Sequence, residues 1–183
     1  MRIVAGLAKG RRLADPAGAT RPTSDRAREA LFNSLAPLVH LDGARVLDLF
    51  AGTGAVGLEA LSRGAAEAVF VESDRAAAEV LRRNLATVGL PGGRVVRRPV
   101  AAFLAEPAPT PFDLVFADPP YALGDEFLAE ILDTLADRKW LADDAVVVVE
   151  RAARGPGPRW PQAIEALRDR RYGEGALWYG RRR

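Results

Sequence analysis

A glycine-rich run and a carboxylate farther along the chain are the first residues whose spacing suggests chemistry. The run Gly52-Thr-Gly-Ala-Val-Gly57 matches the pattern G-x-G-x-x-G and lies between an expected strand and an expected helix. Such glycines allow a tight turn and a close approach of the backbone to a nucleoside cofactor. Glu72 lies 20 residues beyond Gly52, where a dinucleotide fold places the carboxylate that holds ribose hydroxyls. The alternative is that the glycines only turn the chain and Glu72 is a solvated strand end.

Asp48 indicates which cofactor the glycine run suits. It lies four residues before Gly52, where the expected strand emerges beneath the loop. A pyrophosphate there would be repelled by roughly 1 kcal/mol or more even at a screened 4 Å, whereas an ammonium group would gain a charge-assisted partner. S-adenosylmethionine carries an α-amino group and a sulfonium and has no phosphate. The pattern therefore favours S-adenosylmethionine over NAD.

A second candidate site follows another expected strand. Asp118-Pro119-Pro120-Tyr121 combines a carboxylate, two backbone carbonyls without neighbouring N–H donors, and an aromatic face. These groups suit a planar ring with an exocyclic amine: Asp118 and a proline carbonyl accept the two N–H bonds, and Tyr121 stacks on the ring. In-line positioning and electrostatics could then carry a methyl transfer without a histidine base. The alternative is a proline-rich turn with Tyr121 as a packed loop aromatic.

Strands and helices alternate around these motifs. Apolar, β-branched runs predict strands at 45–50, 68–72, 94–97, 112–117 and 144–150, and most gaps between them carry a helical pattern. Alternation of this kind predicts right-handed βαβ units and a parallel sheet covered on both faces. Flanking this core we expect helices at 25–36 and near 161–170, a strand near 176–180 that closes the sheet, and a small hairpin or extended arm within 1–22.

The composition excludes several classes of protein. The 183 residues are 49% hydrophobic and 27% charged, which fits one domain with at most a small appendage. With no cysteine and His40 as the single histidine, thiol chemistry, multi-histidine metal sites and most histidine-relay hydrolases are excluded, and we expect no metal. No apolar run approaches the ~20 residues that span a bilayer, and the first residues lack a signal-peptide pattern. We expect a cytoplasmic monomer without a membrane partner.

Charge is distributed unevenly along the chain. Residues 1–30 hold seven Lys/Arg against three Asp/Glu, and residues 151–183 hold nine Arg against three, so the two ends carry +4 and +6. Because the whole chain carries +2, residues 31–150 carry −8. Basic ends around an acidic centre suggest that the ends contact a polyanion, although a solvated, arginine-rich surface has the same composition. The candidate RNA-binding residues are Lys9, Arg11, Arg12, Arg21, Arg26 and Arg28, with Arg2 beside them.

Together these motifs resemble a known family. The runs Asp48-Leu-Phe-Ala-Gly-Thr-Gly54 and Asp118-Pro-Pro-Tyr121 are similar to those of class I S-adenosylmethionine-dependent methyltransferases that act on exocyclic amines. The block Arg21-Pro-Thr-Ser-Asp-Arg-Ala-Arg-Glu-Ala-Leu-Phe-Asn33, with 2–13 and 57–64, resembles the RsmD-like family of bacterial 16S rRNA guanine-N2 methyltransferases. The resemblance runs from residue 2 to about 150.

The resemblance implies a fold and a target. The fold is α/β and Rossmann-like, with a mostly parallel seven-stranded sheet, helices on both faces and a small N-terminal β-hairpin extension; residues 1–22 form the hairpin or basic arm and 23–183 the methyltransferase domain. The target is the N2 of guanine 966 of 16S rRNA, within the 30S subunit or an assembly intermediate. The implied cofactor site comprises Asp48, Phe50, Ala51, Gly52 and Gly54 around the methionine part and Glu72 at the ribose; 118–121 hold the flipped base.

The chain departs from this pattern at one position. Such enzymes often have an Asp after the third strand that binds the adenine amino group, and this sequence has Arg98-Pro99-Val100 there. Adenine recognition is therefore expected from a backbone group near Val100 or from Ser73.

Two other classes of function remain open from the residues. One is a related methyltransferase of a different amine, such as adenine N6 in DNA or RNA or a glutamine side chain. The other is an NAD-dependent oxidoreductase or a non-catalytic nucleotide-binding module. Asp48 and the lack of a hydride-relay histidine or tyrosine–lysine pair argue against the oxidoreductase, and the arginine-rich arm argues against a protein substrate. The residues alone do not distinguish a DNA substrate from an RNA substrate, and there the family resemblance decides for RNA.

Overall fold

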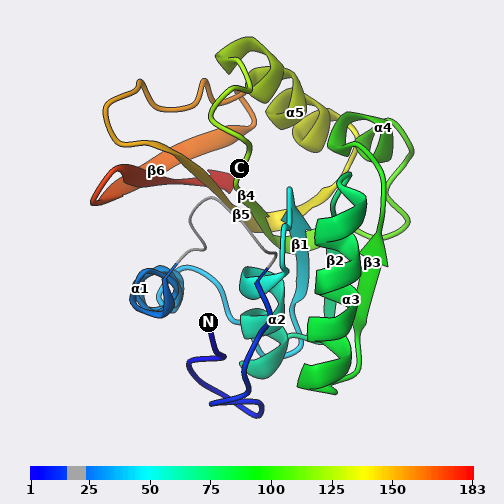
Figure 1. The fold of residues 1–183 in the computed structure, drawn as a ribbon. Helices are drawn as coiled ribbons and strands as arrows, with labels where there is room; N and C mark the ends of the chain where they lie inside the picture. Colours follow the sequence, from blue (N-terminus) through cyan, green and yellow to red (C-terminus); the bar gives the residue numbers. More distant parts are fainter. Residues whose placement is uncertain (16–23) are drawn as a thin grey trace.

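A single seven-stranded sheet organises the part of the chain that the computed structural model describes, residues 1–15 and 24–183 (Figure 1). The strand order is β3-β2-β1-β4-β5-β7-β6. Neighbouring strands from β3 to β5 are parallel, and β7 is antiparallel to both β5 and β6, which confirms the mostly parallel sheet predicted above. The strands are β1 Arg45–Leu49, β2 Glu67–Val71, β3 Gly93–Val96, β4 Phe112–Ala117, β5 Leu141–Ala152, β6 Ile164–Tyr172 and β7 Gly175–Arg182.

Helices cover both faces of the sheet, as predicted. One buried cluster joins α1, α2 and α3 to one face, and a second joins α4 and α5 to the other (Figure 1). Local signals set their ends: Ser24 and Asp74 accept hydrogen bonds from the amides three residues on, at the starts of α1 and α3. The helices are α1 Asp25–Leu35, α2 Ala55–Ser62, α3 Arg75–Val88, α4 Val100–Leu104 and α5 Asp125–Asp137.

The helix predicted near 161–170 is wrong, because this segment forms strand β6. Its Glu, Ala, Leu and Arg residues favour a helix locally. Tertiary pairing prevails over that preference: β6 pairs with β7 from Ile164 opposite Arg182 to Tyr172 opposite Gly175. Gly173, with φ of 57°, makes the tight turn between the two strands. The two strands add an antiparallel hairpin to the edge of the parallel sheet.

The N-terminal segment 1–15 folds back on itself and packs against α2. Arg2 and Arg12 form an antiparallel bridge, and the amide of Ile3 donates to the carbonyl of Arg11 at 2.9 Å. Ile3, Ala8 and Leu13 are buried in the cluster under α1 and α2. The expected boundary between residues 22 and 23 lies outside the described residues. Among residues 1–15 and 24–183, no helix is both long and apolar enough to cross a bilayer.

Candidate active site

The register of the parallel strands aligns one row of side chains near the carboxyl ends. Asp48 of β1 lies beside Phe70 of β2 and Phe116 of β4, and Phe116 lies beside Val148 of β5. The three apolar members belong to the cluster beneath α1, α2 and α3, so this row faces those helices. Asp48 is therefore a carboxyl group within an otherwise apolar row.

Three more carboxyl groups lie two residues farther along the same strands. Because side chains alternate between the faces of a sheet, Glu72, Asp118 and Glu150 continue toward the face that Asp48 occupies. The chain order reverses at β1, which lies between β2 and β4, and open α/β sheets bind ligands at that point of the carboxyl edge. We call Asp48, Glu72, Asp118 and Glu150 the carboxyl row.

Asp48 is the most deeply buried member of the carboxyl row. It is 2% exposed, and one of its oxygens accepts the Gly57 N–H of α2 at 2.9 Å. Burial, helped by the charges of Asp118 and Glu72 and opposed by the Gly57 hydrogen bond, raises the pKa of Asp48 to about 8. A cation beside Asp48 would relieve both the desolvation and the repulsion. The site therefore fits a cationic ligand and disfavours a pyrophosphate.

The glycine loop turns sharply above Asp48. Phe50 and Gly52 have φ of 57° and 54°, and a Cβ added to Gly52 would meet nothing within 4 Å, so this side of the loop is open. At Gly57 an added Cβ would lie 2.3 Å from the Phe70 ring, so glycine permits the close packing of α2 on β2. Ala51 and Gly54 complete the loop through a 2.7 Å hydrogen bond from the Gly54 amide to the Ala51 carbonyl.

Glu72 lies against the glycine loop, as its spacing predicted. One oxygen accepts the Gly52 N–H at 2.8 Å, and the other accepts the Asp74 N–H at 2.8 Å. The side chain thus links the end of β2 to the loop and to the start of α3. Its place beside the loop is suitable for contact with ribose hydroxyls.

Asn84 of α3 is a residue near the loop that the sequence did not single out. The buried side chain donates to the Thr53 carbonyl of the glycine loop at 3.1 Å and to the Ala14 carbonyl at 3.0 Å. It also accepts the Ala14 N–H at 2.7 Å. One amide group therefore connects the N-terminal segment to the glycine loop. Its position on the apolar face of the amphipathic helix α3 could have identified it from the sequence.

The segment 118–121 lies at the end of β4, beside the glycine loop. The Asp118 N–H donates to the Leu49 carbonyl of β1 at 3.4 Å, which fixes the two strand ends together. Burial, followed by the charge of Glu150, raises the pKa of Asp118 to about 7. The Pro120 carbonyl accepts the Leu123 N–H at 2.8 Å within a turn, whereas the Pro119 carbonyl accepts no hydrogen bond from the residues that the structure describes. The Tyr121 side chain is 56% exposed, and its ring can stack on a base.

Two residues of β5 complete this region, and the sequence analysis missed both. Glu150 lies beside Asp118, because its predecessor Val149 pairs with Ala117. Arg151 donates to the Leu123 carbonyl at 3.2 Å and to Asp125 at 2.6 Å, which anchors the turn that follows Asp118. Like Glu72, Glu150 is an acid at the carboxyl end of a buried strand, and this pattern could have identified it from the sequence.

The expected adenine contacts lie on the same edge of the sheet. Ser73 is exposed directly after β2, and Val100 is buried at the start of α4, after β3. Because β2 and β3 are adjacent, the two residues flank one side of the carboxyl row. Arg98 pairs with Glu106 at 2.7 Å, away from this position.

The predicted RNA-binding residues differ in their accessibility. Lys9, Arg12 and Arg26 are exposed, whereas Arg21 lies outside the described residues. Arg11 is exposed too, and its guanidinium donates to the Val88 carbonyl at the end of α3. It therefore has a helix-capping role as well.

The predicted RNA contact at Arg28 is corrected by the structure. The Arg28 side chain is 0% exposed and pairs with Glu59 at 3.4 Å and Asp25 at 3.0 Å. A guanidinium enclosed in this way cannot reach a phosphate. The helical periodicity of α1 could have predicted this burial, because Arg28 lies on the same face as Leu31 and Leu35.

The tip of the N-terminal segment lies at the end of the molecule opposite the carboxyl row. The Leu7 N–H donates to the Ser62 carbonyl at the end of α2, 2.7 Å away. Since α2 begins at the glycine loop and has eight residues, the tip is about 12 Å or more from that loop. Figure 1 shows the blue loop of this segment at the far end of α2, from which the chain runs back toward the other end of the helix. The structure therefore places the tip of the basic arm away from the catalytic candidates, whereas Ala14 lies close to the glycine loop through Asn84.

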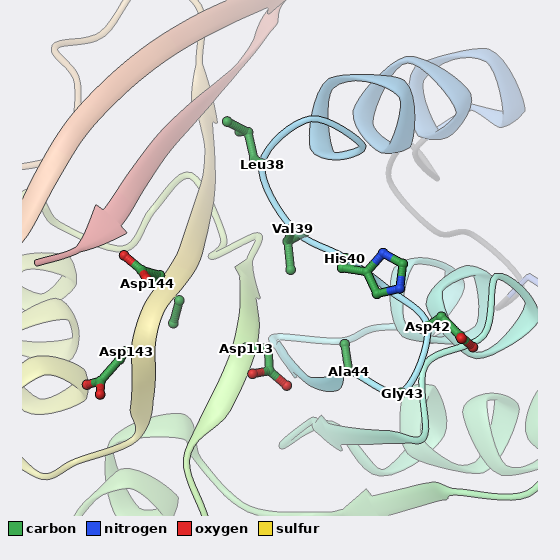
Figure 2. Close-up of a pocket in the computed structure, with 10 residues that line it drawn as sticks. Leu38, Val39, His40, Asp42, Gly43, Ala44, Asp113, Asp143 and Asp144 are labelled. Atoms are coloured by element: carbon green, nitrogen blue, oxygen red, sulfur yellow. The ribbon is translucent and has the colours of Figure 1, made fainter.

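A pocket of about 350 Å³ also lies away from the carboxyl row. Figure 2 shows it between the loop at 38–44 and the amino-terminal parts of β4 and β5, with His40, Asp42, Asp113, Asp143 and Asp144 among its lining residues. Asp113 already accepts the Arg45 N–H at 2.7 Å. Within the described part of the chain, no group of three or more His, Cys, Asp or Glu side chains could hold a metal ion. We therefore assign no catalytic role to this pocket.

Comparison with known proteins finds the same fold in solved structures. A solved structure of magnesium protoporphyrin IX methyltransferase from Synechocystis PCC 6803 with bound SAM shares the fold at 15% identity, with a TM-score of 0.65 over 85% of this chain and 79% of that one. The solved structure of yhhF from Escherichia coli is 43% identical, with a TM-score of 0.88 over 100% and 97% of the two chains. Fold and site together define a Rossmann-like, S-adenosylmethionine-dependent methyltransferase.

The family follows from comparison of the sequences. "Ribosomal RNA small subunit methyltransferase D" of Escherichia coli strain K12 is 46% identical over 162 residues, which are 88% of this chain and 79% of that protein. The family described as "Conserved hypothetical protein 95" matches residues 1–181. The chain therefore belongs to that family, and the predicted family resemblance and class of fold are confirmed.

Proposed function

We propose that this protein transfers the methyl group of S-adenosylmethionine to the exocyclic N2 of a guanine in 16S rRNA. The observation that carries the proposal is the carboxyl row, in which Asp48, Glu72 and Asp118 converge where the sheet order reverses. S-adenosylmethionine supplies an electrophilic methyl group together with an ammonium and a sulfonium charge. These charges suit a site whose buried carboxyls repel one another.

Each group of residues has a distinct part in the proposed reaction. Asp48 and the loop at 50–54 hold the methionine part, Glu72 holds the ribose, and Ser73 or the backbone at Val100 meets the adenine. Asp118 and the Pro119 carbonyl accept the two N–H bonds of the amine, which directs the nitrogen lone pair toward the methyl carbon. Tyr121 stacks on the base. The base must leave its stack to reach this edge, which costs a few kcal/mol unless it is already unpaired.

The basic arm supplies the contact with RNA in this proposal. Residues 1–22 act as an extension of the methyltransferase domain at 23–183, and Lys9, Arg11, Arg12, Arg21 and Arg26 meet phosphates. Support comes from the exposure of Lys9, Arg12 and Arg26 and from the distance between the arm and the carboxyl row. An RNA contacted at both places must extend along α2, which favours a structured substrate such as the 30S subunit or its assembly intermediate. We further propose a cytoplasmic monomer that requires no metal.

The test is to incubate the protein with labelled S-adenosylmethionine and small subunits from a strain that lacks the enzyme. We expect one labelled methyl group on the N2 of a guanine, which nucleotide mapping would place at position 966, and no effect of a metal chelator. Free 16S rRNA and duplex DNA serve as parallel substrates. Label on adenine N6, on a ribosomal protein or only on DNA would contradict the proposed function.

A further inference from the structure

Glu150 is a half-buried carboxyl group that has no role in the proposed reaction. Val149 pairs with Ala117 in the parallel register of β5 and β4, so the next residues, Glu150 and Asp118, lie on adjacent strands. Neighbouring strands are about 4.8 Å apart. Both residues extend the row that includes Phe116 and Val148, so both side chains lie on the face of the sheet that α1, α2 and α3 cover.

The surroundings of Glu150 leave Asp118 as its charged neighbour. On the β7 side Glu150 pairs with Leu177, and a Cβ added to Gly175 would lie 3.2 Å from a Glu150 oxygen. The lack of a side chain at Gly175 thus provides room for the carboxyl group. Arg151 engages Asp125 and the Leu123 carbonyl instead. Across the described ranges, no ion pair is formed by either Glu150 or Asp118.

Two adjacent carboxyl groups without a cation cannot both ionise at low cost. Burial raises the pKa of Glu150, and burial followed by the charge of Glu150 raises the pKa of Asp118 to about 7. Asp48 and Glu72, the other members of the carboxyl row, add no positive charge that would favour ionisation. The charge of Glu150 therefore makes Asp118 a stronger proton acceptor than an isolated aspartate.

We propose that Glu150 is a positioning residue for the reaction, whose negative charge beside Asp118 favours transfer to Asp118 of the proton that the amine releases. The inference rests on the proposed function. The amine nitrogen forms its bond to the methyl carbon while the carbon–sulfur bond breaks and leaves its electron pair on sulfur. The nitrogen then carries one proton too many, which passes to an Asp118 oxygen. Asp118 holds that proton until the product leaves and solvent accepts it.

The first test needs no cofactor or substrate. In the ligand-free protein, a ¹³C NMR titration of the Asp118 carboxyl carbon compares the wild type with Glu150→Gln, which keeps the size of the side chain and removes the charge. We expect the Asp118 midpoint to fall by about one pH unit, because one adjacent negative charge is lost. Glu150→Asp should retain most of the raised midpoint. Glu165→Gln, on the exposed part of β6, is the matched control and should leave it unchanged.

The second test follows a single turnover on small subunits as a function of pH. Since ionised Asp118 is the acceptor, the wild-type rate rises with pH through about 7. In Glu150→Gln this limb should move to lower pH, and the plateau rate should fall roughly tenfold, with the dissociation constant of S-adenosylmethionine within about twofold. An unchanged Asp118 midpoint, or a shifted midpoint with the wild-type rate profile, overturns the inference. A wild-type protein that methylates no rRNA overturns the proposed function instead, whatever the titration gives.

Discussion

Two buried carboxyl groups, Asp48 and Glu59, distinguish the catalytic edge from the region where the N-terminal segment packs. Glu59 of α2 is 0% exposed and contacts Arg28, Arg63 and the backbone amides of Val4 and Ala5. Asp48 is buried to a similar degree, yet among the described residues it accepts one backbone N–H, that of Gly57, and it has two acids nearby. Glu59 is satisfied within the fold, whereas Asp48 has no cationic partner among the residues that the structure describes. We infer that equal burial serves structure in one region and ligand binding in the other.

The largest effect is expected on the stability of the fold, at Glu59. Glu59→Ala removes the buried carboxylate that pairs with both Arg28 and Arg63, and leaves the buried Arg28 guanidinium with less compensating negative charge, so the free energy of unfolding should fall by about 3–5 kcal/mol. Urea unfolding followed by circular dichroism measures this change. Glu165→Ala, which removes an exposed acid, should change stability by less than about 0.5 kcal/mol. A similarly small loss at Glu59 would contradict the structural assignment.

The second-largest effect is expected on catalysis, at Asp118 in the carboxyl row. Asp118→Ala removes an acceptor of the amine hydrogens, so kcat should fall roughly 10²–10³-fold while the cofactor still binds. Single-turnover kinetics on small subunits and isothermal titration calorimetry with S-adenosylmethionine separate the two quantities. Full turnover in this variant would refute the mechanism.

A smaller effect is expected for the cofactor at Asp48. Asp48→Asn keeps the shape of the side chain and removes the charge, so the dissociation constant of S-adenosylmethionine should rise about tenfold or more. Calorimetric titration measures it, with Glu165→Gln as the control. Unchanged affinity would mean that Asp48 serves the fold alone, as Glu59 does.

The same variant should alter the dependence of stability on pH. The folded protein raises the pKa of Asp48 from 3.8 to about 8, so the stability associated with the protonated group is complete below pH 4 and is lost as pH rises through about 8. Asp48→Asn lacks this dependence. Across pH 5–9, the unfolding free energy of the ligand-free wild type should therefore decline relative to that of the variant. Parallel curves for the two proteins would exclude a raised pKa.

The smallest effect on affinity is expected at the N-terminal arm. Replacing Lys9, Arg12 and Arg26 with Ala should weaken RNA binding and lower the slope of log affinity against log salt by roughly 2–3. Filter binding over a salt series measures the slope. Arg98→Ala, which removes a half-exposed arginine that pairs with Glu106 outside the N-terminal arm, is the control. An unchanged slope in the triple variant would remove the arm from the interface.

The sequence predicted the parts of the site that depend on local order along the chain. A strand that ends in an acid or a glycine run can be recognised from its own residues, so Asp48, Glu72 and Asp118 were assigned to the correct edge. The prediction of a helix near 161–170 was wrong, because this segment is a strand only through its pairing with β7. That pairing is a tertiary contact, which the local sequence does not show. Arg28 was misassigned because a charge count does not distinguish a buried guanidinium from an exposed one.

By itself, the sequence determined the five strands from β1 to β5 and the acids at their ends, because the period of apolar residues and the glycine turns are local properties. Only the tertiary structure decided that Glu150 lies beside Asp118, that Glu59 neutralises Arg28 and that the tip of the basic arm, at Leu7, lies at the far end of α2. Those facts depend on the register between strands and on the packing of segments far apart in the chain. A register shift of one residue would turn Glu150 to the opposite face of the sheet, and no local sequence pattern determines the register.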